Sequence, residues 1–249
     1  MGRAFEFRKE RKMKRWSKMA KTFTRIGKDI VIAVKEGGAD PESNSKLRQV
    51  MQNAKNANMP KENVLRAIKK ASSKDTANYE EISFEGYAEN GIAIFIECAT
   101  NNNNRTVADV RSYFNKCKGE LGTNGSLEFL FKRKGVFWVK KTSIEIDLES
   151  LEMELIDSGL EDMQVFEDVI KIYCDIIDFN NLQIKLEELK IEINKSELQR
   201  IPLSTKKISV TKTENILKLI DMLEENEDVQ QVFHNMELTD EIVELLNKE

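Results

Sequence analysis

Histidine is almost absent from this sequence, since His234 is the only one among its 249 residues. A metal centre built on imidazoles, or a distributed Ser-His-Asp site, therefore has little to draw on. Cysteine is also scarce: Cys98, Cys117 and Cys174 lie far apart, and no Cys-x-x-Cys pair occurs. This spacing favours neither a disulfide framework nor a zinc ribbon. We expect each cysteine to be a small buried residue and expect no metal site.

Long apolar runs are missing as well, because no stretch approaches the roughly 20 residues of a membrane span. The basic N-terminus is not followed by the apolar core of a signal peptide. We therefore expect a cytoplasmic protein without a membrane partner. Nucleotide-binding fingerprints are absent, and no pair among the many carboxylates is marked for acid-base work. We expect neither an enzyme nor a cofactor.

Charge is unevenly distributed along the chain. The formal net charge is -4, yet residues 1–77 carry +12 and residues 78–249 carry -16. The stretch "RKERKMKRWSKMAKTFTRIGK", residues 8–28, holds ten Lys and Arg, two aromatic residues and a single acid. Such asymmetry indicates a polyanionic partner for the basic segment.

The basic segment has the pattern of a small helical bundle. From Ala20 to Gly37 the apolar residues follow helical spacing and the basic residues fall on the opposite side. Asp40 is expected to cap a second helix with Pro41 in its first turn, and Pro60 to open a third. A polar linker follows at 72–78. The expected apolar face of the first helix is Phe23, Ile26, Ile30 and Val34, and its basic face is Lys21, Arg25, Lys28 and Lys35.

The pattern after the linker is mixed. Residues 79–87 and 91–99 read as strands, a helix begins near Arg105, and a strand is expected over 126–131. From 135 to 203 the order becomes βαββαβ, which is the ferredoxin-like split unit. Within it "KGVFWV", residues 134–139, is expected to be a core strand.

The last part of the chain predicts strand, helix and strand. "KISV" (207–210) is the expected strand, "TKTE" (211–214) has the form of a capping box, and "VQQVFHN" is the final strand. This unit could complete the strands of 78–134. We therefore predict an α+β protein with a helical domain over 1–77, an α/β domain from 78–134 plus 204–249, and an inserted ferredoxin-like domain over 135–203. Two sequential domains are the alternative.

Several long motifs now resemble one family. They are "GGADPESNSKLRQVMQNAKNANMPKENVLRAIKKA", "FEGYAENGIAIFIECATNNNNRT", "GTNGSLEFLFKRKGV" and "LIDMLEENEDVQQVFHN". In this order, and spanning about 17–242, they are similar to the YebC/PmpR family and to organelle translational activators of cytochrome oxidase. The usual family opening, "GHSKW", is not reproduced at Trp16-Ser17-Lys18.

The resemblance implies a three-domain α+β fold and a non-enzymatic cytoplasmic protein that acts in gene expression. It implies either a DNA-binding transcriptional regulator or a factor on the ribosome or messenger RNA that helps translation through difficult sequences such as proline runs. A protein-interaction module without nucleic-acid contact is a third class. The oligomeric state is open.

The candidate nucleic-acid-binding residues follow from charge. Lys and Arg neutralise phosphates, Phe5, Phe7 and Trp16 could stack on unpaired bases or pack on the bundle, and Arg105 in "NNNNRT" could bind phosphate or sit in a capped loop. "GELGTNGS" (119–126) is expected to be a turn. The candidate set is Arg8, Lys9, Arg11, Lys12, Lys14, Arg15, Trp16, Lys18, Lys21, Arg25, Lys28 and Arg105.

Overall fold

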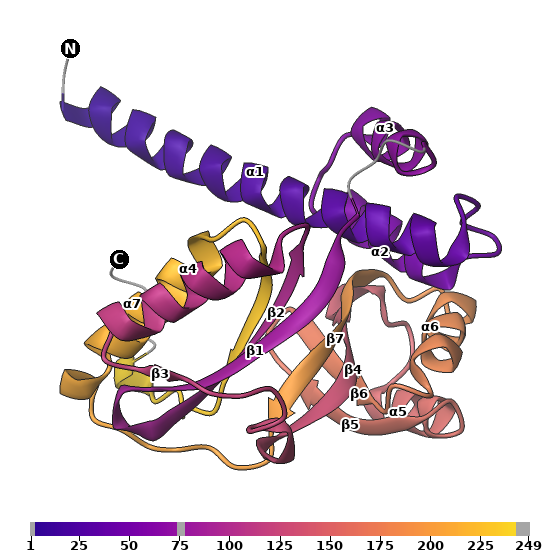
Figure 1. Cartoon of the computed structure of the whole chain (residues 1–249). Coiled ribbons are helices and arrows are strands. Elements are labelled where there is room, and N and C mark those ends of the chain that lie inside the picture. The colour runs from indigo at the N-terminus through magenta and orange to yellow at the C-terminus, as the bar shows by residue number, and fades with distance from the viewer. Residues whose placement is uncertain (1–2, 74–77, 243–249) are drawn as a thin grey trace. The chain divides into compact units, whose positions relative to one another are not determined.

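The computed structural model of this chain describes the backbone of residues 3–73 and 78–242. Its side chains are described for residue 17 and for residues 19–73 and 78–242. The chain forms two compact units, Met1–Glu80 and Glu81–Glu249 (Figure 1).

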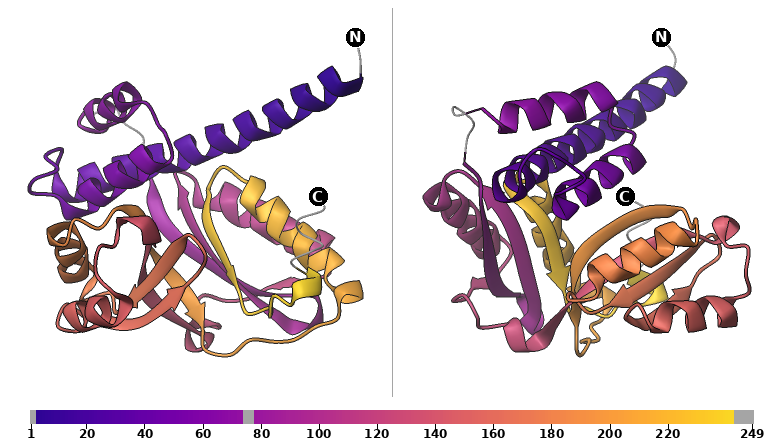
Figure 2. Two further views of the ribbon diagram at one scale, coloured as in Figure 1. Left: turned by 180° about the vertical axis from the view of Figure 1, so that it is seen from behind. Right: turned by 90° about the vertical axis from the view of Figure 1, so that its right-hand side faces the viewer.

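Three helices make up the N-terminal unit: α1 (Arg3–Gly37), α2 (Ser45–Asn56) and α3 (Lys61–Ala71). Figure 2 shows α2 and α3 lying beside the C-terminal half of α1. Ile30, Leu47 and Ala54 are fully buried in the core that the three helices share. The 35 residues of α1 make a rod of about 52 Å at 1.5 Å per residue.

The turn between α1 and α2 corrects our expectation that Asp40 caps the second helix. α2 begins at Ser45, and Asn44 is its N-cap. The Asn44 side chain accepts a hydrogen bond from the Leu47 amide at 3.0 Å and donates to the carbonyl oxygens of Ala33 (2.7 Å) and Gly38 (2.8 Å). One buried amide therefore ends one helix and starts the next. Asp40 Oδ1 instead accepts a hydrogen bond from the Glu42 amide at 3.1 Å, within the turn between the two helices.

The first sheet has the strand order β3-β1-β2-β8. Its strands are β1 (Glu80–Ala88), β2 (Ile92–Thr100), β3 (Glu120–Leu121) and β8 (Val229–His234). Helices α4 (Asn103–Lys116) and α7 (Glu214–Glu225) cover one face of it (Figure 1). Ile94, Ile96, Phe114 and Leu219 are fully buried in that layer, because alternate residues of a strand point to the same face.

The second sheet has the order β5-β6-β4-β7, all antiparallel. It contains β4 (Phe131–Lys140), β5 (Leu160–Val165), β6 (Val169–Cys174) and β7 (Ile193–Pro202), with helices α5 (Leu148–Ile156) and α6 (Phe179–Glu188) on one face. Gly135 sits where β4 meets α6, since a Cβ there would lie 2.5 Å from the Phe179 ring. The βαββαβ order and the strand order match the predicted ferredoxin-like unit.

β8 completes the first sheet after the chain has built the second. β8 pairs antiparallel with β2, with Ile94 opposite His234 and Phe95 opposite Phe233. The predicted α+β class, with an N-terminal helical region and two four-stranded sheets, is confirmed. The domain boundaries at 77, 134 and 203 stay a proposal.

Three local expectations were wrong. Residues 128–130 form a 3-10 turn instead of a strand, and β4 begins at Phe131. Residues 207–210 form no strand; the bridge there joins Lys206 to Met236, and a 3-10 turn follows over Val210–Lys212. The capping box is not formed, because α7 begins at Glu214 with Thr213 as its N-cap, and the Thr213 hydroxyl donates to the Val210 carbonyl oxygen.

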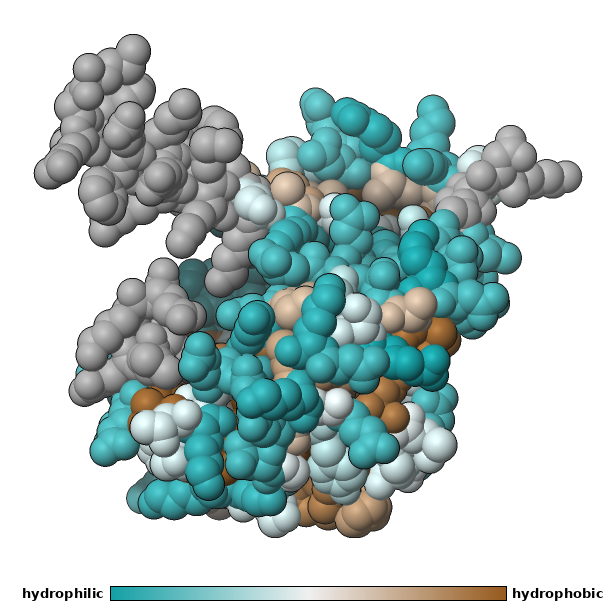
Figure 3. All heavy atoms as spheres, turned by 60° about the vertical axis from the view of Figure 1, so that its left-hand side comes forward, coloured by the Kyte–Doolittle hydropathy of each residue, from teal (hydrophilic) through white to brown (hydrophobic). Residues whose placement is uncertain are grey.

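Figure 3 shows a face of the molecule on which hydrophilic side chains predominate and hydrophobic ones occur in small groups. Among the described residues, no helix combines the length and the apolar character needed to cross a membrane.

Candidate nucleic-acid interface

The predicted basic arm lies within α1. Residues 8–18 belong to the backbone of this helix, so the arm is helical along this stretch. Its predicted contact residues lie outside the part of the chain whose side chains are described, and their role stays a prediction. They are Arg8, Lys9, Arg11, Lys12, Lys14, Arg15, Trp16 and Lys18. The aromatic residues Phe5 and Phe7 also lie outside the part of the chain whose side chains are described.

The described basic residues of α1 divide into two kinds. Lys21 and Arg25 are partly exposed. Lys28 is buried, with 7% of its surface exposed, and its Nζ lies 5.2 Å from the centre of the Tyr79 ring. Our expectation that Lys28 belongs to an exposed basic face was therefore wrong. The aliphatic stem of Lys28 packs within the N-terminal unit, and its ammonium lies over the face of the Tyr79 ring.

Further exposed cations occur on α2 and α3, and no sequence motif indicated them. The net charge of +12 over residues 1–77 could have indicated them, because it exceeds the net charge of residues 8–28 alone. α3 also ends with basic residues in its last turn, where cations interact favourably with the helix dipole. The exposed cations of these two helices include Arg48, Lys55, Lys61, Arg66 and Lys69.

Arg105 takes part in a buried polar cluster at the start of α4. Its Nη2 donates to Asp228 Oδ2 at 2.6 Å, and this bond raises the pKa of the guanidinium. The same oxygen accepts from the hydroxyls of Thr106 (2.9 Å) and Thr100 (3.2 Å). Asn102 is the N-cap of α4 and accepts from the Arg105 amide. The motif "NNNNRT" therefore connects the start of α4 by hydrogen bonds to Asp228, just before β8. A phosphate contact by Arg105 stays a prediction.

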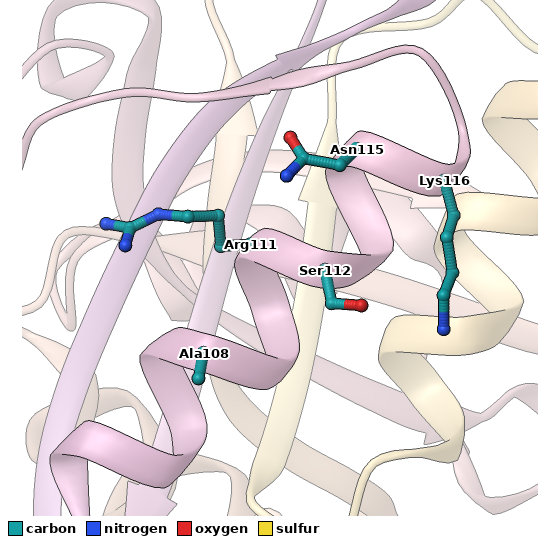
Figure 4. A pocket seen from close by; sticks show the side chains of 5 residues that line it. All are labelled: Ala108, Arg111, Ser112, Asn115 and Lys116. Atoms are coloured by element: carbon teal, nitrogen blue, oxygen red, sulfur yellow. The ribbon is translucent and has the colours of Figure 1, made fainter.

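A shallow depression of about 490 Å³ lies on the outer side of α4. Figure 4 shows Arg111 and Lys116 pointing away from one another, with Ser112 and Asn115 between them along the helix. Ala108 is the remaining lining residue, so two cations, an amide and a hydroxyl occur there without a carboxylate. This composition suits an anionic ligand. No motif predicts this depression, because Arg111 and Lys116 occupy an ordinary exposed helix face.

The glycine-rich loop is an internal structure. Glu85 on β1 has 1% of its surface exposed. Its Oε1 accepts from the Gly125 amide at 2.8 Å and its Oε2 from the Leu127 amide at 2.5 Å. Amides that a phosphate would need are thus already bound to a carboxylate of the same chain. The loop has a structural role, as the turn interpretation expected, but Glu120 and Leu121 at its start form β3 and pair with β1.

The cysteines are all buried, as predicted. Burial raises the pKa of the Cys174 thiol to about 12, so it remains a protonated, unreactive side chain at neutral pH. Within the described residues, no group of three or more His, Cys, Asp and Glu side chains is arranged to hold a metal ion.

Comparison with known proteins connects this architecture to one family. The sequence pattern of the TACO1/YebC protein N-terminal domain matches residues 3–74, and that of the TACO1/YebC second and third domain matches residues 79–236. Two relatives are named "Probable transcriptional regulatory protein". The one from Flavobacterium johnsoniae is 60% identical over 95% of this chain and 99% of its own length, and the one from Porphyromonas gingivalis is 57% identical over 95% and 97%.

A solved structure agrees with the sequence comparison. The crystal structure of a conserved hypothetical protein from Aquifex aeolicus superimposes with a TM-score of 0.80 at 38% identity, covering 90% of this chain and 92% of that one. The predicted family resemblance is confirmed over both units of the chain. This protein belongs to the TACO1/YebC family.

Proposed function

We propose that this protein is a cytoplasmic, non-enzymatic regulator of gene expression that binds nucleic acid through its N-terminal unit. The observation that carries the proposal is a net charge of +12 over residues 1–77, concentrated along one helix of 35 residues. The names of its relatives support a role in gene regulation.

The physical basis is contact with the phosphate backbone. A basic rod of about 52 Å can follow several successive phosphates, and each neutralised phosphate releases condensed counterions. The exposed cations of α2 and α3 add further positive charge to the same unit. Residues 78–249 carry a net charge of -16, so the long-range attraction to a polyanion comes from the N-terminal unit.

The salt dependence of binding tests this proposal on the full-length protein. The variant R8Q/R11Q/K14Q/R15Q/K18Q removes five positive charges of α1 and leaves the buried Lys28 intact. Because each phosphate contact contributes about 0.9 to the slope of log affinity against log salt, we expect the slope to fall by up to about 4.5. The measurement is fluorescence anisotropy with a short duplex DNA and a short RNA.

A matched control removes the same charge elsewhere. K118Q/K141Q/K190Q/K207Q/K212Q neutralises five exposed lysines of the second unit and should leave the slope unchanged. Equal slopes in both variants, or no salt-dependent binding by the unaltered protein, would favour a protein-interaction module instead.

The type of nucleic acid is decided in cells. We would crosslink the tagged protein with ultraviolet light and sequence the recovered DNA and RNA side by side. Discrete promoter peaks would identify a transcriptional regulator. Crosslinks concentrated in ribosomal and messenger RNA would identify a translation factor and leave DNA contact as charge-driven background.

A further inference from the structure

The second sheet has one face that its own helices do not cover. Phe137 and Val139 of β4 point into the core formed with α5 and α6. Trp138 lies between them and therefore points to the opposite face, where it is partly exposed. The expectation that residues 134–139 form a core strand is confirmed, since they lie within β4 and all but Trp138 are buried.

Aromatic and basic side chains form a row across this open face. Trp138 is directly opposite Lys171 on β6 and Lys195 on β7. The Nζ atoms of these lysines lie 5.8 and 5.1 Å from the centre of the Trp138 ring. The Lys171 Nζ is also 5.1 Å from the ring of Phe166, which follows β5 and is 48% exposed. We call Phe166, Lys171, Trp138 and Lys195 the aromatic row.

The two lysines of the aromatic row differ in whether a carboxylate already pairs with them. Lys195 is 52% exposed and bonds Glu197 Oε2 at 2.6 Å. For Lys171 the only partners among the described residues are the two aromatic rings, and no carboxylate pairs with it. An ammonium held between two rings without a counter-ion is available to a ligand phosphate.

Polar groups line the row on the β5 side. The Tyr173 hydroxyl on β6 donates to Gln164 Oε1 on β5 at 3.2 Å, and Gln164 Nε2 donates to Asp162 at 3.1 Å. These residues stand on the same face as Trp138, because Tyr173 and Lys171 are two apart on β6. They offer hydrogen bonds to base edges or to ribose hydroxyls.

We propose that the aromatic row is a binding site for unpaired RNA. Trp138 and Phe166 stack on successive bases, while Lys171 and Lys195 contact the intervening phosphates. Stacking needs bases that are not enclosed in a duplex, and in cells such bases occur mainly in the loops and single strands of RNA. Aromatic rings on the open face of a four-stranded sheet, with cations between them, supply both contacts that this ligand requires.

This site deepens the proposed function by naming the form of nucleic acid that the second unit reads. It involves no residue of α1, so the two proposals fail independently. Loss of salt-dependent binding in the α1 variant concerns the N-terminal unit. Loss of discrimination between unpaired and paired RNA concerns the aromatic row.

Tryptophan fluorescence provides a direct measurement. The chain has two tryptophans, so Trp16→Phe, which keeps an aromatic ring at this candidate contact of α1, leaves Trp138 as the only tryptophan in the full-length protein. We expect an RNA of about 12 unpaired nucleotides to quench this emission, since a stacked base lies against the indole. The same RNA annealed to its complement should quench it much less. Equal quenching by both forms, or none by either, overturns the proposal.

Substitutions test the residues one kind at a time, with anisotropy as the readout. F166L/K171Q should weaken binding of the unpaired RNA by at least about fivefold, the lower bound for one lost stack, while duplex binding changes less. The control F129L/K190Q changes an exposed phenylalanine and an exposed lysine outside the row and should bind like the unaltered protein. Trp138→Phe keeps an aromatic face and should retain most of the affinity.

An unchanged preference for unpaired RNA in F166L/K171Q overturns the proposal, and so does an equal loss in the control. Should F166L/K171Q fail to fold, the quenching experiment still decides. Tighter binding of single-stranded DNA of the same sequence would overturn the assignment to RNA.

Discussion

At the scale of single residues, His234 is unusual because it is the only histidine in the chain and is held in a sheet. It lies opposite Ile94 on β2, and its buried Nδ1 has no hydrogen-bond partner among the described residues. Burial lowers its pKa from 6.5, against a smaller opposing effect of a backbone hydrogen bond with Met236. The folded protein therefore prefers the neutral imidazole.

This preference predicts a pH-dependent stability. Below pH 6.5 the unfolded chain binds a proton that folded His234 binds less readily, so the free energy of unfolding falls as the pH falls. The slope is at most about 1.4 kcal/mol per pH unit and ends below the folded pKa. Urea unfolding at a series of pH values between about 5 and 7 measures it. In His234→Gln the free energy of unfolding should change less with pH over this range. An unchanged slope would mean that another group causes the pH dependence.

Two residues show where sequence reasoning stops at this scale. Helical spacing placed Lys28 away from the apolar side, but spacing does not say how far the neighbouring chain reaches around the helix, and Tyr79 meets its ammonium. Alternation in "KGVFWV" predicted a strand correctly. It could not show that helices would cover only the Phe137 face and leave Trp138 partly exposed.

At the scale of elements, the cluster around Asp228 joins the start of α4 to the residues before β8. Asp228 has 4% of its surface exposed, and Thr100 and Thr106 are fully buried beside it. Its backbone carbonyl oxygen also accepts from the Ala99 amide at 2.8 Å. A single carboxylate thus accepts hydrogen bonds from three side chains, two of which are fully buried.

Asp228→Ala should therefore destabilise the protein. Breaking a buried ion pair costs about 3–5 kcal/mol, but the Arg105 side chain is 50% exposed and water will solvate part of its charge. We expect a loss of about 2 kcal/mol in the free energy of unfolding, measured by urea denaturation. The neighbouring exposed carboxylate gives the control, since Glu227→Ala should change it by less than about 0.5 kcal/mol. Similar losses in both would show that the cluster is not the cause.

Element boundaries were the part of the fold that the sequence predicted least well. Asp40-Pro41 and "TKTE" both have the composition of helix starts, yet the helices begin at Ser45 and Glu214. Many side chains can cap a helix, and packing selects among them. Asn44 is selected because its amide also reaches two carbonyl oxygens at the end of α1.

At the scale of the whole molecule, element order predicted the architecture better than any local motif did. A lone strand-helix half before residue 134 and another after 203 could complete one sheet only together, and β8 does pair with β2. The uneven distribution of charge along the chain indicated the N-terminal unit as the candidate nucleic-acid interface. It could not reveal the aromatic row, because Phe166, Lys171, Trp138 and Lys195 come together only when four strands pair.

Removal of β8 tests the proposed division into an α/β domain and an inserted domain. Truncation after Asp228 deletes the partner of β2, so hydrogen exchange should become fast in β1 and β2. Protection in β4 to β7 should persist, because their sheet and its core with α5 and α6 are complete without β8. Mass spectrometry of exchanged peptides measures both regions. Loss of protection throughout would mean that the two sheets fold only as one unit.

Because β8 is synthesised long after β2, its partner in the sheet, the fold also has a consequence for biosynthesis. β2 has the sequence "IAIFIECAT" and ends at Thr100, whereas its neighbour starts at Val229. At ordinary elongation rates of about 5–20 residues per second, the ribosome needs on the order of ten seconds to make the chain between them. Throughout that interval the nascent polypeptide exposes a strongly apolar edge strand, the kind of segment that nucleates aggregation. The yield of native protein should therefore depend on the speed of translation downstream of β2 and on chaperones that shield this edge.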